Sequence, residues 1–459
     1  MMTQIKFLKM VSAAPIILAL IVVMSCAHKE LVGELINNPP TYKVEFDFSD
    51  PEKLRDHLRK IDDFKTQENQ QKLIQILIAY NNLKKAQSKN QITLAPHSKT
   101  RIVVASFCAA SEKAIPERKE IFKWAKGTPK ISLIKEVLDL YAKNAESNIQ
   151  RVQELIWNLE NETYYDEYPD FLKELVKQAS PSAPLTLPSR LKSQIVDELT
   201  PQEIKDTINL VKGKYYSFNE FKKVIETKRS NFILPESSFV SKLPETDISA
   251  TTSSRGYESQ IITFYNSTNN IGIFKTTSYY LKPIRDDVQP IILASVFPYE
   301  NEIQKILEES ALKLLGYLGS QYPTLNPSEK ALVKQNPIEA AITFYDAFLA
   351  ERNGDRFFPS SGQNGASDSF RHFAWAGLLT RDLGEETARK FLNAHELNSS
   401  QPSEEKAMDE FNNERGILAA NQFLKRGNFE NAELYEKATE EVKSGKLRIL
   451  NYESRQKHH

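Results

Sequence analysis

The sequence predicts a mainly α-helical protein with three parts: a helical N-terminal domain, a small β-hairpin module and a helical C-terminal domain. Apolar residues recur at helical spacing through most of residues 49–228 and again through residues 299–459. Only 15 of the 459 residues are Gly, and Lys, Glu and Leu are abundant, which favours helix over sheet. Between the two helical parts, residues 229–298 lose the helical spacing and gain β-branched and aromatic residues, which favours strands.

Residues 1–25 have the pattern of a secretory signal. Lys6 and Lys9 precede a short apolar run over residues 11–23, and small residues follow it before Cys26. The run is too short for a comfortable transmembrane helix. A cysteine in this position resembles the lipobox of bacterial lipoproteins, which implies cleavage before Cys26 and lipidation of its thiol and new amino group. The alternative is an ordinary signal peptide followed by a chance cysteine.

Lipidation at Cys26 implies an envelope protein that is held on the membrane by its anchor. Ala27 follows the cysteine, and the rules of the lipoprotein family then imply the outer membrane if the cell is Gram-negative. Lys plus Arg and Asp plus Glu both number 60, so the chain lacks the basic excess that nucleic-acid binding needs. Of the 2 Cys, only Cys108 would remain unmodified, so no disulfide framework supports the fold.

Residues 26–48 are expected to form a tether that ends in a short strand, because Val44, Phe46 and Phe48 alternate with polar residues. Residues 49–228 then form the helical domain, whose first helix begins after Asp50 with Pro in its first turn. A short β-like run over residues 102–108 interrupts this helical pattern.

In residues 229–298, two β-like runs at 261–265 and 271–275 flank the polar loop 266–270. This pattern predicts a β-hairpin with a loop of about five residues. Helical spacing returns in the C-terminal domain, residues 299–459, where amphipathic stripes precede a run of chemically capable residues between positions 368 and 416.

That run contains three predicted helices whose polar faces should point inward. Asp368 and His372 share one face of the first helix, and His395 lies on the apolar side of the second, with Glu396 beside it. Asp409 begins a polar face of the third helix that continues through Asn412, Asn413, Gly416 and Ala420. Small residues in such a stripe predict the close approach of a neighbouring helix.

Together these helices would collect imidazoles, carboxylates and amides in one place. The candidate catalytic residues are His372, His395, Asp409 and Glu396, and the candidate ligand-binding residues are Asp368, Arg371, Asn412 and Asn413. His372, His395 and Asp409 could hold a divalent metal, or a His could act as a base oriented by an Asp. The spacing matches no diagnostic metal motif, so the sequence does not name a cofactor. The alternative is a satisfied hydrogen-bond network that only fixes helix packing.

The pattern D-x-F-R-H-x-x-W, followed by H-E and M-D-x-x-N-N-x-x-G, resembles an uncharacterised bacterial domain of secreted, toxin-like and phage-related proteins. The resemblance covers about residues 337–425 and departs from the family pattern at Ser369, where Ala is usual, and at Ile417, where Arg is usual. It implies a functional site without naming a reaction. It carries over onto Asp368, Phe370, Arg371, His372, Trp375, His395, Glu396, Met408, Asp409, Asn412, Asn413 and Gly416.

A second, separate pair is Cys108, which ends a β-like run, and Gln153, which lies in a later Q-x-x-I-W pattern. The two resemble the thioester domains of bacterial surface adhesins, although Val152 and Leu155 depart from the usual Thr and Ala. The resemblance implies an internal thioester that captures amines. The alternative is a buried apolar cysteine and a surface Gln on an amphipathic helix.

Two functions therefore remain open for this lipid-anchored envelope protein. One is a hydrolase that acts on an envelope polymer, a lipid or a phosphoester through the His and Asp residues of the C-terminal helices. The other is a non-catalytic surface protein for binding or adhesion, in which the polar cluster is structural and a Cys108–Gln153 thioester contributes attachment.

Overall fold

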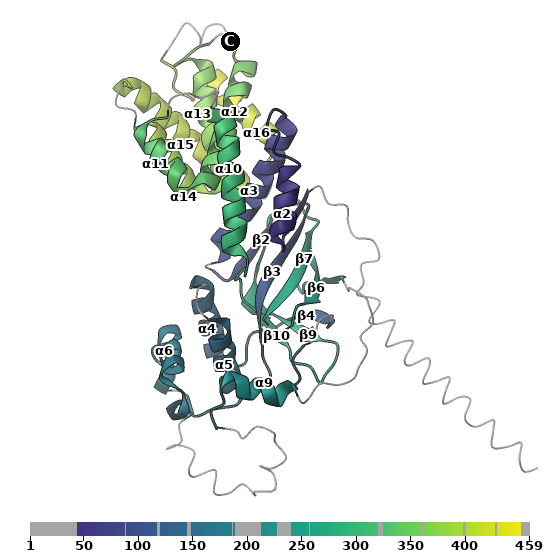
Figure 1. Cartoon of the computed structure of the whole chain (residues 1–459). Coiled ribbons are helices and arrows are strands. Elements are labelled where there is room, and N and C mark those ends of the chain that lie inside the picture. Colours follow the sequence, from purple (N-terminus) through teal and green to yellow (C-terminus); the bar gives the residue numbers. More distant parts are fainter. Residues whose placement is uncertain are drawn as a thin grey trace, which may run out of the picture.

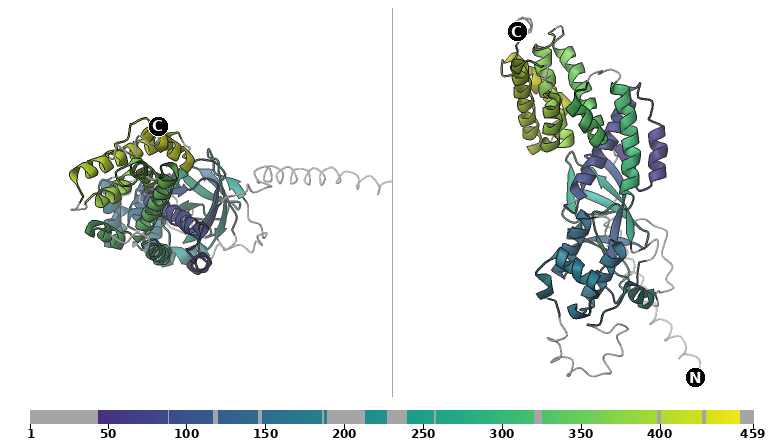
Figure 2. Two further views of the ribbon diagram at one scale, coloured as in Figure 1. Left: turned by 90° about the horizontal axis from the view of Figure 1, so that it is seen from above. Right: turned by 60° about the vertical axis from the view of Figure 1, so that its left-hand side comes forward.

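The structure is a computed structural model that describes residues 44–450, apart from 88, 117–119, 145–147, 186, 189–212, 227–239, 257, 320–324, 360, 398–400 and 427–428. Figures 1 and 2 show an elongated molecule with a sheet in its middle and a group of helices at each end. Among the described residues, none of the helices combines the length and apolar character needed to cross a membrane. The predicted signal and the lipidation site Cys26 lie outside the described residues.

The N-terminal part supplies four strands and most of one helical group. Its elements are β1 Val44–Phe48, α2 Pro51–Arg59, α3 Gln67–Gln87, β2 Gln91–Leu94, β3 Ser98–Cys108, β4 Phe122–Lys126, α4 Ser132–Lys143, α5 Ile149–Glu160, α6 Asp170–Ala179 and α9 Phe218–Glu226. The middle part supplies the other strands: β5 Val240–Lys242, β6 Ile248–Ser254, β7 Ser259–Asn266, β8 Gly272–Lys275, β9 Tyr279–Pro283 and β10 Ile291–Leu293. The C-terminal helices are α10 Glu300–Gly319, α11 Pro327–Gln335, α12 Pro337–Phe357, α13 Ala366–Leu383, α14 Glu385–His395, α15 Ser403–Lys425 and α16 Asn431–Lys443.

The prediction of a mainly α protein with a small hairpin module is wrong, because the strands build one large sheet. Eight strands join in the order β4-β9-β10-β3-β7-β6-β5, with β1 added beside β3. The sheet curls until its two ends contact each other, where Lys126 pairs with Glu245 and Tyr279 donates to the carbonyl of Pro244 (3.3 Å). Local periodicity misses this sheet because β3 and β4 pair with strands that follow much later in the chain.

The central strand is β3, whose neighbours on both sides are distant in sequence. Its first half lies parallel to β1 and antiparallel to β7, and its last three residues pair with β10. Both faces of β3 are covered, so every residue of its second half is buried and nearly all of them are apolar. The predicted strand over residues 102–108 is confirmed as part of β3, and the predicted alternation at Val44, Phe46 and Phe48 is confirmed as β1.

The predicted hairpin between β7 and β8 is also wrong. Both edges of β7 are occupied by β3 and β6, so β8 turns away and pairs antiparallel with β2 in a separate two-stranded sheet. The buried side chain of Asn266 holds this turn, because its Nδ2 donates to the carbonyls of Ala95 and Asn270 (both 2.9 Å). The loop residues therefore direct the chain into a second sheet instead of closing a hairpin.

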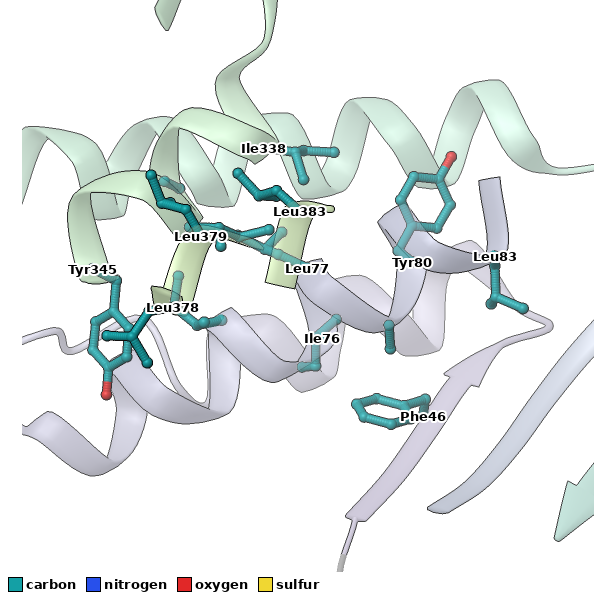
Figure 3. Close-up of a cluster of buried hydrophobic side chains, with 14 of the residues drawn as sticks. Phe46, Ile76, Leu77, Tyr80, Leu83, Ile338, Tyr345, Leu378, Leu379 and Leu383 are labelled. Carbon is teal, nitrogen blue, oxygen red and sulfur yellow. The ribbon is translucent and has the colours of Figure 1, made fainter. Parts of the chain in front are cut away.

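One hydrophobic core runs from the sheet into the C-terminal helices. Helix α3 lies between them, with residues such as Ile76 near Phe46 of β1 and Leu77 near Leu379 of α13 (Figure 3). A second core joins α4, α5 and α6 to the opposite end of the sheet through Phe107 of β3. The sheet is therefore the scaffold for both helical groups.

Candidate functional site

Helix α13 is the centre of the C-terminal group and is buried on almost all sides. It packs against α12, α14, α15 and α16, and nearly every residue from Ala366 to Leu383 is buried. Helix α15 approaches it very closely at Gly416, where any Cβ would overlap the carbonyl oxygen of Phe373. The small-residue stripe predicted on α15 thus does allow the close approach of its neighbour, and it brings the polar face of α15 onto α13.

This approach forms a buried group of four side chains, called here the carboxylate cluster: Asp368, His372, Glu396 and Asp409. His372 Nε2 lies 3.3 Å from Asp409 Oδ1 and 3.7 Å from Asp368 Oδ1, and its Nδ1 lies 3.7 Å from Glu396 Oε1. One ligand atom each from Asp368, His372 and Asp409 can be chosen so that all lie within 4.8 Å of one another. Ligand atoms about 2.1 Å from a shared ion lie about 3.0–3.4 Å apart, so this set is close to coordination spacing.

Asn413 orients the imidazole of His372. Its Nδ2 donates to Glu396 Oε1 (3.0 Å), so its Oδ1 faces the other way and accepts from His372 Nδ1 (3.3 Å). Nδ1 therefore carries the hydrogen, and the lone pair of Nε2 points at the two Asp carboxylates. This is the usual arrangement around a metal-ligating His, whose second nitrogen donates to an outer partner.

The protonation states follow from burial. Burial lowers the pKa of His372 well below its ordinary value, and the nearby charges of Arg371 and His395 lower it further, so the imidazole is neutral. Burial also raises the pKa of Asp409 to about 7, reinforced by the charges of Glu396 and Asp368. The pKa of Glu396 is raised, again mainly by burial. Burial therefore makes it costly for Asp409 and Glu396 to be charged at the same time.

Some carboxylate oxygens of the cluster have partners and others do not. Asp368 Oδ2 accepts from the backbone N–H of Asn364 (2.8 Å), and Asp409 Oδ2 accepts from Gln401 Nε2 (2.7 Å). Asp409 Oδ1 and Glu396 Oε2 are buried without a hydrogen-bond partner among the described residues. A buried polar atom of this kind costs about 1–3 kcal/mol, and more if it is charged.

Arg371 supplies the positive charge that directly contacts the cluster. Its Nη2 lies 2.5 Å from Asp368 Oδ1 and 3.3 Å from His372 Nε2. The guanidinium thus contacts two of the three donor atoms that could hold a metal. Its side chain is 38% exposed, whereas that of Asp368 is 5% exposed, so Arg371 reaches the cluster from the outside.

His395 lies beside the cluster and not within it. Its Nδ1 is 2.7 Å from Glu329 Oε1, and its ring packs edge-on against Trp375 at 5.1 Å. Burial opposes protonation of His395, but the hydrogen bond and the charge of Glu329 raise its pKa overall. His395, Trp375 and Arg371 line one side of a pocket of about 250 Å³ between α11, α12, α13 and α14.

The structure brings the predicted site residues together unequally. Asp368 occupies the third donor position that the sequence analysis assigned to His395. Asn412 points away from the cluster and exchanges hydrogen bonds with the backbone of Arg448 (both 3.0 Å). Sequence reasoning missed Gln401 and Glu329. Glu329 was recognisable as the last member of an N-P-S-E capping box, which the structure contains, but nothing local indicated its partner across the bundle.

The second predicted pair is also in contact. The backbone N–H of Cys108 donates to Gln153 Oε1 (2.7 Å), and Gln153 Nε2 donates to the carbonyl of Cys108 (3.0 Å). Both residues are fully buried, so Gln153 is not a surface residue of its helix. Burial raises the pKa of the Cys108 thiol.

Comparison with known proteins gives a match that covers the carboxylate cluster. No curated protein and no solved structure matches the chain. A family model described as a domain of unknown function (DUF6973) matches residues 330–446. These residues include all four members of the cluster, so the C-terminal region of this chain contains an uncharacterised domain with the candidate site at its centre.

Proposed function

We propose that residues 330–446 form a metal-dependent hydrolase domain whose divalent ion is held by Asp368, His372 and Asp409. The observation that carries the proposal is Asp409 Oδ1, a carboxylate oxygen that is buried without a hydrogen-bond partner 3.3 Å from a neutral imidazole nitrogen. Either a proton on Asp409 shared with Nε2 or a bound cation would satisfy this atom, and the spacing of the three donors favours the cation. A divalent cation would both neutralise the carboxylates and bind the unpaired oxygen.

The donor set restricts the identity of the ion. One imidazole nitrogen with two carboxylates favours Mn²⁺, Fe²⁺ or Zn²⁺ over Mg²⁺ or Ca²⁺, which bind oxygen donors. Glu396 Oε2 is a further unpaired oxygen beside the set. Glu396 contacts His372 on its Nδ1 side (3.7 Å) and lies outside the three-residue donor set, so it would supply negative charge behind the imidazole and not a fourth ligand.

A divalent ion in this site would supply a Lewis acid and a water of lowered pKa. The protein's own groups supply orientation and proton transfer. Asn413 holds His372 in the tautomer that directs Nε2 at the site. His395, with its Nδ1 bound to Glu329, has Nε2 left to give a proton to a leaving group in the pocket.

Metal content tests the proposal directly. The full chain, purified without an added His tag, should contain close to one equivalent of Mn, Fe or Zn by elemental analysis, or take up one equivalent of Mn²⁺ in a titration. The Asp409→Asn variant should lose the metal. Its metal-free melting temperature should be unchanged or higher, because the substitution removes a buried charge that has an unpaired oxygen.

Two neighbouring residues on α15 supply a matched control. Asn413→Ala should weaken metal binding by about 10–100-fold, as expected for an outer-shell partner of a ligating His. Asn412→Ala should lower stability only, because Asn412 binds the backbone of Arg448. Hydrolysis of p-nitrophenyl phosphate and p-nitrophenyl butyrate should follow metal content across the series. A chain that takes up no Mn²⁺ or Zn²⁺ would contradict the proposal.

A second candidate function is favoured by the contact between Cys108 and Gln153. Thioester formation would join the Cys108 sulfur to the Gln153 side-chain carbon, and the amide nitrogen would leave as ammonia with the thiol proton. A target amine would later attack that carbon and release the thiol. The surrounding apolar cluster, which includes Trp157 and Phe221, would protect the bond from water. In this reading, the domain around the sheet attaches the protein to an amine-bearing partner.

Intact mass spectrometry decides this second candidate. A thioester makes the protein lighter by one molecule of ammonia. Methylamine opens the thioester and leaves a protein that is heavier than the original amide form by one methylene group. Cys108→Ala and Gln153→Ala should abolish the deficit. Gln289→Met is the control, because Gln289 is a buried Gln in the same region that hydrogen-bonds Trp157 and Ala110 but not Cys108. A full-length mass without the deficit excludes a thioester.

The lipid anchor is the third part of the proposal and rests on the sequence pattern at Cys26. An anchored protein would bring both candidate activities to an envelope surface, where polymers, lipids and amine-bearing partners are available. Metabolic labelling with palmitate should mark the mature chain and should fail in the Cys26→Ser variant. Labelling that persists in this variant would place the lipid elsewhere.

A further inference from the structure

The pocket beside the carboxylate cluster is lined by apolar side chains and by a few charged ones. Val333, Phe344, Ala347, Trp375 and Phe391 supply hydrocarbon and aromatic surface from four helices. Its volume of about 250 Å³ is slightly below that of typical small-molecule sites and suits a short chain or a single headgroup. Trp375 is a rigid part of this wall, because its Nε1 donates to the carbonyl of Thr343 (3.2 Å).

Arg371 is the cation available to a ligand in the pocket, whereas the Thr343 hydroxyl is buried away from it. Arg371 lines the pocket while its Nη2 contacts Asp368 and His372. His395 and Glu329 face the same space but bind each other, so their charges are largely compensated.

Arg371 and a metal ion would compete for the same two atoms. A divalent ion bound to Asp368 Oδ1 and His372 Nε2 cannot share them with a guanidinium that lies 2.5 Å and 3.3 Å away. Metal binding must therefore move the guanidinium, and the pocket is the space that its half-exposed side chain already borders. There it would present a planar set of donors matched to a phosphate or carboxylate.

We infer that the pocket binds the apolar part of a short alkyl oxyanion and that Arg371, displaced by the metal, binds its charged end. This inference rests on the proposed metal site and names the substrate class for it: an alkyl phosphate monoester. The inference makes metal and anion binding cooperative. The metal moves Arg371 into the pocket, where it can bind the anion, and the bound anion keeps Arg371 away from the metal-binding atoms. Such coupling is reciprocal, so the anion must tighten metal binding by the same factor.

The test is a pair of calorimetric titrations of the full chain with hexyl phosphate, without metal and with saturating Mn²⁺. The metal should tighten hexyl phosphate binding at least tenfold. Arg371→Gln should bind Mn²⁺ at least as tightly as the wild type, because the competing cation is gone, and should lose the coupling. Equal hexyl phosphate affinity with and without metal overturns the inference.

Variants of the wall test where the alkyl chain lies. Ala347→Leu fills the pocket and should abolish hexyl phosphate binding while leaving Mn²⁺ binding intact, whereas the same substitution at the exposed Ala331 of the adjacent α11 should change neither. Inorganic phosphate that binds as tightly as hexyl phosphate would show that the apolar wall is unused and overturn the inference.

The sign of the ligand's charge has its own test. Glu351 also lines the pocket and would repel an oxyanion, so Glu351→Gln should strengthen hexyl phosphate binding. Hexyltrimethylammonium should not compete with hexyl phosphate; if it binds more tightly, the ligand class is wrong. Mn²⁺ binding without any coupling to hexyl phosphate leaves the metal site standing and removes only this inference, whereas failure to bind Mn²⁺ removes both.

Discussion

At the scale of single residues, Gly416 decides how α13 and α15 meet. A methyl group there would overlap the backbone carbonyl of Phe373, and backbone atoms cannot move aside without separating the helices. Gly416→Ala should lower the free energy of unfolding by more than about 2 kcal/mol, although Ala is the better helix former by about 1 kcal/mol. Urea denaturation followed by circular dichroism measures the change.

Gly377 is the matched control for this prediction. It is also a buried helical glycine, and an added methyl would meet only the side chain of Leu434. The terminal carbons of a Leu can rotate away, so the gain in helix propensity offsets the crowding. Gly377→Ala should change stability by less than about 1 kcal/mol in either direction. Equal losses at both glycines would mean that the contact with the Phe373 carbonyl is not the cause.

A second residue-scale feature is Asp346, a fully buried carboxyl on α12. Neither of its oxygens has a hydrogen-bond partner in the described part of the chain, and the nearby Arg381 binds Asp382 instead (2.6 and 2.7 Å). Burial and then the charge of Asp382 raise the pKa of Asp346 well above its ordinary value of 3.8, although Arg381 opposes the shift. The folded protein therefore holds a proton at Asp346 that the unfolded chain releases.

This proton makes stability depend on pH in a defined direction. Because the folded-state pKa is the higher one, stability from this group is present at low pH and is lost as pH rises above about 4 toward the folded pKa. Asp346→Asn should flatten this fall by up to about 1.4 kcal/mol per pH unit. Urea denaturation between pH 4.5 and 8 compares the two proteins, and parallel curves would contradict the assignment. Asp409 and Glu396 also lower stability as pH rises. They do so in both proteins, so their contribution cancels in the difference between the two curves.

At the scale of elements, the loop between β7 and β8 determines that they enter different sheets. Asn266 is fully buried, its Nδ2 binds two carbonyls, and its Oδ1 accepts from the N–H and hydroxyl of Thr268. Asn266→Ala would leave these backbone groups without partners and should cost about 2–4 kcal/mol of unfolding free energy. The exposed Asn270, substituted in the same way, should cost less than about 0.5 kcal/mol. Thermal melting of both variants checks the difference.

Helix α13 is the element that unites the candidate site. It carries aromatic residues on opposite faces, and both faces are buried. A helix with this environment holds its polar side chains rigidly, so Asp368 and His372 are fixed relative to each other one turn apart. The same burial makes every unpaired oxygen near them costly, which is why the chemistry of the cluster points to a bound cation.

At the scale of the whole molecule, α3 joins the sheet to the C-terminal helices. Leu77 lies fully buried in the core shared by both parts, and Lys85 Nζ donates to the carbonyl of Leu383 at the end of α13 (2.6 Å). Leu77→Ala should cost about 2–5 kcal/mol, because it leaves a cavity in this shared core. Hydrogen exchange should accelerate in α13 and β1 together.

The exposed Gln71 on the same helix is the control for Leu77, and Gln71→Ala should change exchange in neither region. If Leu77→Ala accelerates exchange in β1 alone, the sheet and the C-terminal helices unfold as separate units. In that case the shared core would not couple them, and residues 330–446 could be studied as an isolated domain.

The sequence alone determined the features that depend on neighbours within a few turns of chain. Helical spacing identified the C-terminal helices, and the Gly–Ala stripe of α15 predicted a close helix contact. Residue chemistry likewise singled out His372, Asp409, Glu396 and Asn413, which the structure brings together. These features could be predicted because they follow from the geometry of one helix and the cost of burying polar groups.

Only the tertiary structure decided the features that depend on pairing between distant segments. The large sheet was missed because β3 pairs with β1, which precedes it, and with β7 and β10, which follow it much later. Strand pairing depends on which strand edges remain open and not on local composition. For the same reason Asp368 lies beside His372 and Asp409, whereas His395 pairs with Glu329. Which side chains meet is set by how helices cross, and that crossing is fixed by packing across the whole core.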